Sequence, residues 1–244
     1  MGSRVPISLL PGEGSLNAYE RHYRIYCHLS PCYCVIFDRT ENFLITGADD
    51  NLIKVININL GLLKFTYRGH AAEIADIAVS QCNQLVASGS VDKIVRVWRL
   101  QNGETLAVFK HHTACITSVR FLPFAENGDT RYLVTIGNDC VINFYAFNEE
   151  NPEFPPNCLV FSRNERDQPG AKMMSICHSE GGHMVVVGES HGIIRVYRLH
   201  ETGRVEKTDD IVAHTHRIDS LVWAHNGLKF ASGSKDGVAK VRRN

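Results

Sequence analysis

Histidine, serine or threonine, and aspartate recur together along this chain of 244 residues. His70, Ser88 and Asp92 are the residue types of a hydrolytic triad, in which the histidine takes the hydroxyl proton and the aspartate orients the histidine. A catalytic site is normally built once, but equivalent sets recur here as His28, Thr46 and Asp50; as His112, Thr135 and Asp139; and as His214, Ser232 and Asp236. We therefore interpret these residues as structural, and no residue is predicted to be catalytic. A hydrolase is kept as the least favoured alternative.

A second cluster combines cysteine with histidine. Cys27, His28, Cys32 and Cys34 lie within eight residues, but they lack the paired Cys-x-x-Cys arms of a zinc site. His111 beside His112, and His214 near His216, each include one histidine that the recurring set already uses. We predict free thiols and no metal, and because no phosphate-binding or dinucleotide-binding glycine pattern occurs, no cofactor either.

The elements that carry these residues are predicted to be short strands. Val, Ile and Thr make up 51 of the 244 residues and occur in runs such as residues 53–56 and 184–187, which are too short for helices. Turn-forming residues rich in Gly, Asn and Asp separate the runs, as at 48–51 and 234–237. The chain is therefore predicted to be all-β.

The turns repeat in register. Gly89-Ser90-Val91-Asp92 followed by Lys93 to Trp98 matches segments beginning at Gly47, Gly188 and Gly233, and more loosely one at Gly137. The corresponding turn positions 50, 92, 139, 191 and 236 are 42, 47, 52 and 45 residues apart. A unit of forty-odd residues with four short strands is the period of a propeller blade.

These residues resemble the WD-repeat family. The resemblance rests on Gly69-His70, Ser88-Gly89, Asp92 and Trp98, although the usual Trp-Asp ending is degraded in every copy. It implies a β-propeller of four-stranded antiparallel blades, here with five recognisable repeats and an incomplete ring. It also implies that the histidine, hydroxyl and aspartate of each repeat, with Trp98 at its strand end, hydrogen-bond inside a blade. The fourth repeat has His191 at the turn and Val187 at the hydroxyl position, so we expect that blade to rely on packing and to be the least rigid.

A narrower resemblance is to the bromodomain and WD-repeat-containing proteins, the group of the pleckstrin-homology-domain-interacting protein. It is carried by residues 28–40, 68–74 and 90–98. It implies a non-enzymatic interaction scaffold in the nucleus that serves transcription, chromatin and cell-shape regulation, and possible service as a substrate receptor of a ubiquitin ligase. The Trp-Asp-x-Arg signature for adaptor docking is missing, since Arg99 follows Trp98. A general cytoplasmic WD-repeat scaffold is the alternative.

The family geometry also implies a partner-binding rim at one end of the channel. Side chains three and five residues after each repeat histidine, and the residue before each turn aspartate, would point there. The candidate rim residues are Tyr33, Asp49, Glu73, Lys172, Met174, Arg217, Asp219 and Lys235. A solvated rim that binds nothing is the competing interpretation.

Composition and domain organisation complete the predictions. Equal numbers of acidic and basic residues, 26 of each, disfavour non-specific binding to nucleic acid or membranes, and the partners expected are proteins or peptides. No apolar run is long enough to span a bilayer, and the start does not resemble a signal peptide, so an intracellular protein is expected. We predict an N-terminal extension over residues 1–22 and a repeat region over 23–244, with repeat cores at about 28–57, 70–99, 112–146, 170–198 and 214–243. Five repeats leave two blade faces unpaired, so missing blades or a partner are expected to close the ring.

Overall fold

The described part of the chain is built entirely from strands and their connections. The computed structural model describes residues 25–123, 130–148, 152, 154–225 and 227–243. Its strands form five antiparallel sheets, four with four strands and one with three. The predicted all-β repeat architecture is confirmed. The fifth sheet has three strands within the described residues, which end at 243.

Each sheet is a meander whose strands pair with their neighbours in sequence. The first sheet contains β1(Cys32–Phe37), β2(Phe43–Ala48), β3(Ile53–Asn57) and β4(Leu62–Tyr67). The second contains β5(Ile74–Val79), β6(Leu85–Ser90), β7(Val95–Arg99) and β8(Thr105–Phe109). The third contains β9(Ile116–Phe121), β10(Thr130–Gly137), β11(Val141–Asn148) and β12(Leu159–Asn164). The fourth contains β13(Met173–His178), β14(Met184–Glu189), β15(Ile193–Leu199) and β16(Val205–Val212), and the fifth contains β17(Ile218–Trp223), β18(Lys229–Ser234) and β19(Ala239–Arg243). We call these sheets blades 1 to 5.

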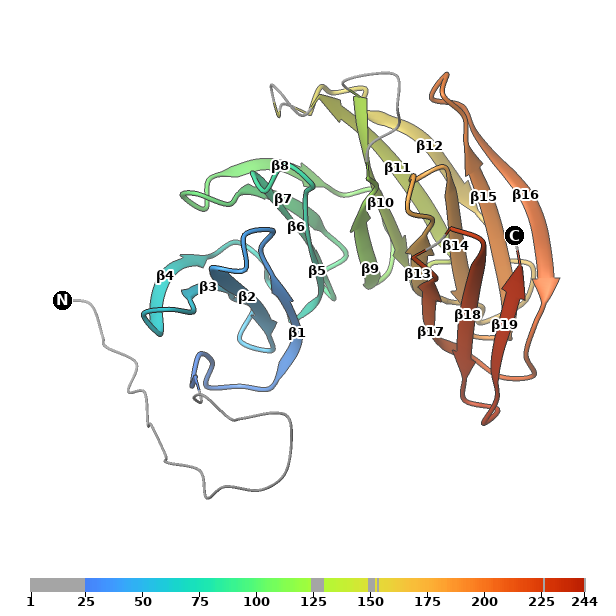
Figure 1. The fold of residues 1–244 in the computed structure, drawn as a ribbon, viewed down its shortest axis with the longest axis horizontal. Coiled ribbons are helices and arrows are strands. Elements are labelled where there is room, and N and C mark those ends of the chain that lie inside the picture. The colour runs from blue at the N-terminus through green and yellow to red at the C-terminus, as the bar shows by residue number, and fades with distance from the viewer. Residues whose placement is uncertain (1–24, 124–129, 149–151, 153, 226, 244) are drawn as a thin grey trace.

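The blades stand side by side in an open arc (Figure 1). The first strand of each blade contacts the first strand of the next, so that β1 contacts β5, β5 contacts β9, β9 contacts β13 and β13 contacts β17. These five strands therefore line the inner side of the arc, which is the wall of a propeller channel. No helix within the described residues is long and apolar enough to cross a membrane.

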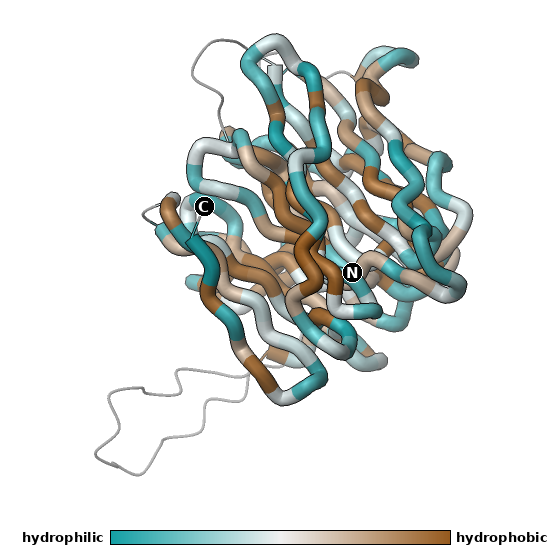
Figure 2. The backbone as a smooth tube through the Cα atoms, turned by 90° about the vertical axis from the view of Figure 1, so that its right-hand side faces the viewer, coloured by the Kyte–Doolittle hydropathy of each residue, from teal (hydrophilic) through white to brown (hydrophobic). Residues whose placement is uncertain are grey.

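Apolar cores lie between neighbouring blades. Between blades 1 and 2, for example, Ile45 and Val55 pack in one buried cluster with Ile74 and Trp98. Three comparable clusters follow along the arc. Figure 2 shows apolar residues gathered along the strands and hydrophilic residues at the turns between them. Because each core is shared by two blades, the stability of one blade depends on its neighbours.

The turn after each second strand has one conformation in all five blades. The residue that follows the turn aspartate, or His191 in blade 4, has a positive φ angle: Asn51 (63°), Lys93 (71°), Cys140 (62°), Gly192 (82°) and Gly237 (82°). This left-handed conformation is uncommon for residues with a Cβ atom. The tight turn brings the aspartate back over the end of the sheet, beside the repeat histidine.

Candidate functional site

Four side chains of blade 2 form a connected hydrogen-bonded chain. Trp98 Nε1 donates to Ser88 Oγ at 2.8 Å, and Ser88 Oγ lies 2.8 Å from His70 Nε2. His70 Nδ1 lies 2.8 Å from a carboxylate oxygen of Asp92. An ionised carboxylate only accepts, so His70 carries its proton on Nδ1, and its Nε2 accepts from the serine hydroxyl. Each donated proton in this series of hydrogen bonds thus points toward Asp92.

The same geometry recurs in three other blades. The histidine Nδ1 lies 2.9 to 3.0 Å from the nearest aspartate oxygen, and Nε2 lies 2.8 to 2.9 Å from the hydroxyl oxygen. The groups are His28, Thr46 and Asp50; His112, Thr135 and Asp139; and His214, Ser232 and Asp236. In blade 3 the amide of Asn143 approaches His112 Nε2 as well, at 3.1 Å. The structure therefore brings together every set that the sequence analysis singled out.

The aspartates of these sets also hold the backbone. Asp92 accepts from the N–H of Ala71, next to the histidine, at 3.0 Å and from the N–H of Ile94, beyond the turn, at 2.9 Å. Asp139 accepts the equivalent two bonds from the N–H groups of Thr113 and Val141. Asp236 accepts them from the N–H groups of Thr215 and Val238. Each of these carboxylates thus ties the loop before the inner strand to the turn after the second strand.

Burial and hydrogen bonding set the protonation states of this network. Burial lowers the pKa of His70, more than the hydrogen bond to Asp92 raises it. Burial alone would raise the pKa of Asp92, but the Ala71 N–H and His70 outweigh it and lower the pKa. Burial opposes ionisation of Asp236 too, yet the N–H of Val238 and the bond from His214 lower its pKa to about 2. These shifts describe a neutral histidine beside an ionised aspartate.

The serine and threonine hydroxyls are inaccessible to a substrate. Ser88 and Thr135 are fully buried, and the hydroxyl of Ser88 is already engaged by Trp98 and His70. A nucleophile must reach the atom that it attacks. The arrangement therefore suits a structural clasp between two loops and leaves no room for acyl transfer at this oxygen.

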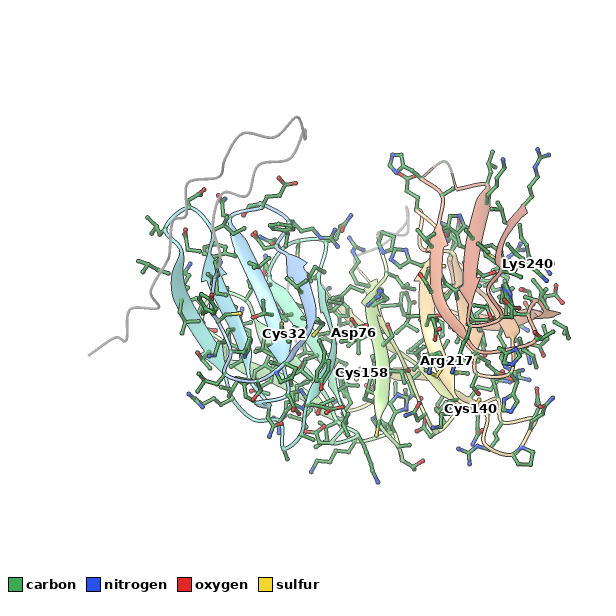
Figure 3. All side chains as sticks on the ribbon, turned by 90° about the horizontal axis from the view of Figure 1, so that it is seen from below. Cys32, Asp76, Cys140, Cys158, Arg217 and Lys240 are labelled. Carbon is green, nitrogen blue, oxygen red and sulfur yellow. The ribbon has the colours of Figure 1, made fainter. Side chains whose placement is uncertain are left out.

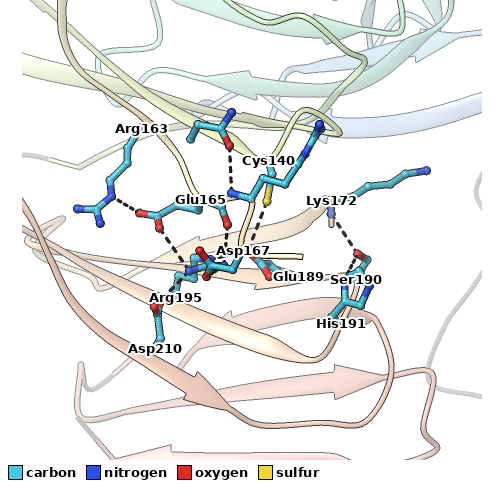
Figure 4. A network of polar contacts seen from close by, with 12 residues as sticks. Cys140, Arg163, Glu165, Asp167, Lys172, Glu189, Ser190, His191, Arg195 and Asp210 are labelled. Atoms are coloured by element: carbon cyan, nitrogen blue, oxygen red, sulfur yellow. Dashed lines mark hydrogen bonds and ion pairs between the residues drawn. The ribbon is translucent and has the colours of Figure 1, made fainter. Parts of the chain in front are cut away.

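Blade 4 contains a different network, and the expectation that it relies on packing alone is wrong (Figure 4). Arg195, on β15, is fully buried and donates from Nε to Glu189 on β14. Its other nitrogens reach Glu165 Oε2 at 3.3 Å and Asp167 at 2.7 Å, both in the segment after β12. Arginine makes this possible because its planar guanidinium offers five donors in a fixed geometry.

Further groups complete this charged cluster. Asp210 on β16 accepts from Arg195 at 3.2 Å, and Lys207 lies 2.8 Å from Glu165 and 2.5 Å from Asp210. Tyr197, at the position that Trp98 occupies in blade 2, donates to Glu165 at 3.1 Å. Burial would lower the pKa of Arg195, but Glu189 and Asp167 raise it, so the guanidinium stays charged. The bond from Arg195 in turn lowers the pKa of Asp167.

Sequence reasoning missed this cluster although one signal was present. Arg195 lies four residues after the turn position, where the other repeats have Lys54, Arg96, Asn143 and Lys240. Lys54 and Lys240 donate to the carbonyl of the residue before the repeat histidine, each at 2.5 Å. In blades 1 and 5 the lysine at this position thus has its partner at the start of its own repeat. Blade 4 has no such histidine, and there the cation binds acidic side chains instead.

A β-bulge at the start of every inner strand shapes the predicted rim. In all five blades the register between first and second strands skips one residue, and the skipped residues are Tyr33, Ala75, Thr117, Met174 and Asp219. A bulge leaves its extra residue unpaired and redirects its side chain. In blades 1, 2, 3 and 5 the skipped residue is the fifth residue after the repeat histidine. In blade 4, which has no repeat histidine, Met174 occupies the equivalent position.

A backbone bond joins the two other rim positions of each blade. The residue before the turn donates its N–H to the carbonyl three residues after the repeat histidine, over 2.8 to 3.1 Å. The pairs are Asp49 with Pro31, Val91 with Glu73, Asn138 with Cys115, Ser190 with Lys172, and Lys235 with Arg217. Each blade thus presents its rim residues at one edge of its sheet.

The rim is charged differently at its two ends. Blades 1 and 2 carry Tyr33, which is exposed over 55 % of its surface, and the charge of Asp49 is the main cause that raises its pKa, followed by desolvation and the charge of Glu73. Blades 4 and 5 carry exposed Lys172, Arg217 and Lys235. Asp219 offsets part of that charge through its ion pair with Arg217 at 2.6 Å, and Met174 is half-buried. One end is acidic and aromatic, and the other is basic.

The cysteines form no disulfide, and all eight are free thiols. Burial raises the pKa of Cys34, Cys140 and Cys177 to about 12, so these thiols are protonated near neutral pH. No group of three metal-ligating side chains occurs within the described residues.

Comparison with known proteins identifies the repeats. The model of the WD domain, G-beta repeat, matches residues 20–57, 61–99 and 206–242. A bromodomain and WD repeat-containing protein of Dictyostelium discoideum is 32% identical over 136 residues, which are 54% of this chain and 6% of that protein. Autophagy-related protein 16 of Arabidopsis thaliana is 23% identical over 89% of this chain and 39% of its own length.

Two further similarities extend over most of the chain. Eukaryotic translation initiation factor 3 subunit I of Emericella nidulans is 26% identical over 84% of this chain and 60% of its own length. The crystal structure of the computationally designed Ika8 protein superimposes with a TM-score of 0.69 at 23% identity, over 90% of this chain and 60% of the designed one. The chain thus spans less than two thirds of each of these proteins.

Proposed function

We propose that this chain, which carries WD40 repeats on a propeller-like fold, is a non-enzymatic scaffold that binds other proteins or peptides. WD-repeat proteins act as protein-interaction scaffolds. The observation that carries the proposal is the contrast between the histidine sets and the bulged residues of the inner strands. The polar atoms of the His70 set are buried and paired, whereas Tyr33 and Asp219, two of the bulged residues, are exposed.

The rim residues are the proposed contact surface. An exposed aromatic ring flanked by carboxylates, as at Tyr33 with Asp49 and Glu73, suits a basic side chain of a partner. Lys172, Arg217 and Lys235 at the other end suit an acidic one. A peptide with basic and acidic ends would therefore lie across the rim in one direction only. The zero net charge supports the further proposal that neither nucleic acid nor a membrane surface is a direct partner.

The narrower biological role is proposed from the resemblance alone. We infer nuclear service in transcription, chromatin and cell-shape regulation from similarity to a bromodomain and WD repeat-containing protein. The role of ubiquitin-ligase substrate receptor belongs to the same inference. Relatives in autophagy and translation initiation support the alternative of a cytoplasmic scaffold. The location of a fluorescent fusion of the chain in living cells distinguishes the two.

Site-specific photocrosslinking tests the rim. A photoreactive phenylalanine analogue replaces Tyr33 in one variant and Val160 in a control, since Val160 is exposed on β12, the fourth strand of its blade. We expect adducts to discrete proteins in nuclear extract from position 33 and none of these from position 160. The Glu73→Ala substitution should weaken the adducts. Equal adducts from both positions would contradict a rim site.

The hydrolase alternative has its own measurement. A screen with activated esters should show no turnover, because Ser88 is buried and hydrogen-bonded. Turnover that the Ser88→Ala substitution abolishes, with stability unchanged, would overturn the non-enzymatic proposal.

A further inference from the structure

The inner wall of the arc has a hollow at the end opposite the rim. It measures about 290 Å³ and is lined by residues from the inner strands of blades 1 to 4. Arg39 follows the end of β1, Val79 ends β5, Phe121 ends β9 and His178 ends β13. The rim residues lie at the starts of the same strands. The hollow and the rim are therefore separate surfaces of the channel wall.

Arg120 is held at this hollow by a half-buried carboxylate. Its Nη1 lies 2.6 Å from a carboxylate oxygen of Asp76 on β5, the neighbouring inner strand. The same oxygen accepts from Ser118 Oγ and from the N–H of Val119, so the carboxylate is fixed. Figure 3 shows Asp76 near the middle of the row of inner strands. Nε and Nη2 of Arg120 bond to no acceptor in the described part of the chain.

Arg39 is oriented by the backbone of the next blade. Its Nε donates to the carbonyl of Ser80 at 3.3 Å, and its Nη2 donates to the carbonyl of Val79 at 3.1 Å. Its own N–H is held by Asn83 at 2.9 Å. The guanidinium is thus fixed before any ligand arrives, and its Nη1 has no acceptor among the described residues. Fixed donors lose little conformational freedom when they bind.

His178 lines the hollow with a nitrogen that can only accept a hydrogen bond. Its Nδ1 lies 2.9 Å from the carbonyl of Ser179, so this nitrogen carries the proton and Nε2 is left without a partner in the described ranges. Burial lowers the pKa of His178 first, and the charges of Arg120 and Arg39 lower it further. Both cations therefore act on the same small volume as the imidazole.

The charges of the hollow do not balance. Two guanidinium groups and one carboxylate line the hollow, and that carboxylate, Asp76, already accepts four hydrogen bonds. Most of the remaining wall is apolar, from Ile36, Ile77 and Phe121 among others. A nucleic acid backbone needs a row of cations, which this hollow lacks. A single anionic group with a short apolar stem matches the donors and the walls.

We propose that this hollow binds an anionic side chain, a carboxylate or a phosphate, on a segment of a partner protein that enters the channel opposite the rim. Arg120 and Arg39 supply charge-assisted hydrogen bonds to the anion, and the apolar wall contacts its stem. This site is independent of partner binding at the rim.

Titration of the isotopically labelled chain of 244 residues, followed by NMR, tests the site. The probes are the blocked tripeptides Ala-Glu-Ala and Ala-phosphoserine-Ala, with Ala-Gln-Ala as the uncharged control. We expect the charged probes to shift resonances of His178 and Arg120 and the uncharged one to leave them unmoved. Tighter binding of the phosphoserine probe would indicate a phosphorylated side chain on the partner. Equal or tighter binding of the glutamate probe would indicate an Asp or Glu side chain on the partner.

Matched variants make the test specific. Arg120→Gln and Arg39→Gln should each weaken the better probe about tenfold, the effect of one charge-assisted hydrogen bond, while Arg120→Lys should retain part of the affinity. Arg99→Gln is the control, because Arg99 ends β7 and pairs with Glu104 at 3.2 Å, and neither residue belongs to the hollow or the rim. Equal losses in the Arg99 and Arg120 variants would overturn the proposal. So would shifts caused by Ala-Gln-Ala, or tighter binding of a uridine oligonucleotide that depends on Arg120.

Discussion

At the scale of single residues, the histidine sets repeat the same hydrogen bonds in four of the five blades. The histidine of a serine hydrolase has the same two partners, but there the serine oxygen is open to the substrate. Here Ser88 is fully buried, and its oxygen is engaged by both His70 and Trp98. The set therefore acts as a link between two loops, and its loss should reduce stability.

The first prediction concerns Asp92. Asp92→Ala removes the acceptor of His70, whose side chain is 1% exposed, and leaves a buried donor unpaired. We expect the free energy of unfolding to fall by about 1 to 3 kcal/mol, measured by urea denaturation. The control is Glu104→Ala, which breaks a surface ion pair with Arg99 and should change stability by less than about 1 kcal/mol. Equal stability of the Asp92 variant and the parent chain would contradict the structural role.

A second prediction follows from the pKa shifts. The lowered pKa of His70 means that the unfolded chain binds its proton more readily than the folded chain. Stability should therefore decline as the pH falls below about 6.5, the value for a free histidine. The lowered pKa values of Asp92 and Asp139 add a second decline as the pH falls below about 3.8.

Urea denaturation between pH 8 and pH 3 measures both declines. The His70→Gln variant should lose part of the slope between pH 7 and pH 5 because its glutamine does not titrate. A parent chain whose stability is constant from pH 8 to pH 5 would show that His70 titrates alike in both states.

At the scale of elements, blade 4 shows how one position of the repeat can support two designs. The basic residue four positions after the turn caps a carbonyl in blades 1 and 5, whereas Arg195 organises acidic groups from β14, β16 and the segment after β12. Removing one member of a buried ion network costs more than replacing the network, because unpaired charge remains.

The third prediction tests that asymmetry. Arg195→Leu leaves Glu189 buried without its cation, while Glu165 keeps Lys207, and we expect a loss of about 3 to 5 kcal/mol in unfolding experiments. The double variant Arg195→Leu with Glu189→Leu should be more stable than the single one. Arg198→Leu is the control, since Arg198 lies exposed on the same strand. A cost no larger than that of the control would show that the cluster does not stabilise blade 4.

A fourth prediction uses the two glycines of the repeated turn. Gly192 and Gly237 share a φ angle of 82° and the same place in their repeats. A Cβ atom on Gly192 would lie 2.0 Å from the carbonyl oxygen of His214, while one on Gly237 meets nothing within 4 Å. The carbonyl of Gly192 also accepts from Ala213 and His214, which joins blade 4 to blade 5.

Thermal unfolding of the two alanine variants separates strain from crowding. Gly237→Ala should cost about 1 to 2 kcal/mol, the price of a left-handed backbone alone. Gly192→Ala should cost clearly more, because the backbone of the next blade must move as well. Equal costs would mean that the contact between the blades yields without penalty.

At the scale of the whole molecule, the two outermost faces differ from the faces between blades. Val35 and Phe37 on β1 are 63% and 57% exposed, while the equivalent Ile77 and Val79 on β5 are 3% and 2% exposed. On the last blade, Val222 is 58% exposed where Ala78 is buried at the equivalent place. Apolar faces of this kind bind further surface or promote association. This contrast supports the proposal that further blades or a partner cover them.

The fifth prediction addresses these faces. Light scattering coupled to size exclusion should show that residues 1–244 associate as concentration rises, since apolar faces pair when nothing else covers them. Phe37→Asp and Val222→Asp should each reduce the association, whereas Val160→Asp, at an exposed position away from both faces, should leave it unchanged. A monomer at every concentration would contradict self-pairing of the faces.

The sequence alone determined the repeat, the strands and the histidine sets. A constant interval joins His28 to Asp50, His70 to Asp92 and His214 to Asp236, and short-range turn chemistry then brings each pair together within one blade. Such contacts follow from local spacing, so periodicity is enough to predict them.

Only the tertiary structure decided which separate segments meet. The Arg195 cluster combines Glu165 and Asp210, which lie on either side of it in sequence without any repeated interval. The bulges that turn out Tyr33 and Asp219 depend on strand register, which residue types do not specify. The hollow around Arg39, Arg120 and His178 exists because four inner strands end at the same level. The physical reason is that these features depend on how blades pack against one another, whereas the repeat encodes the interior of each blade.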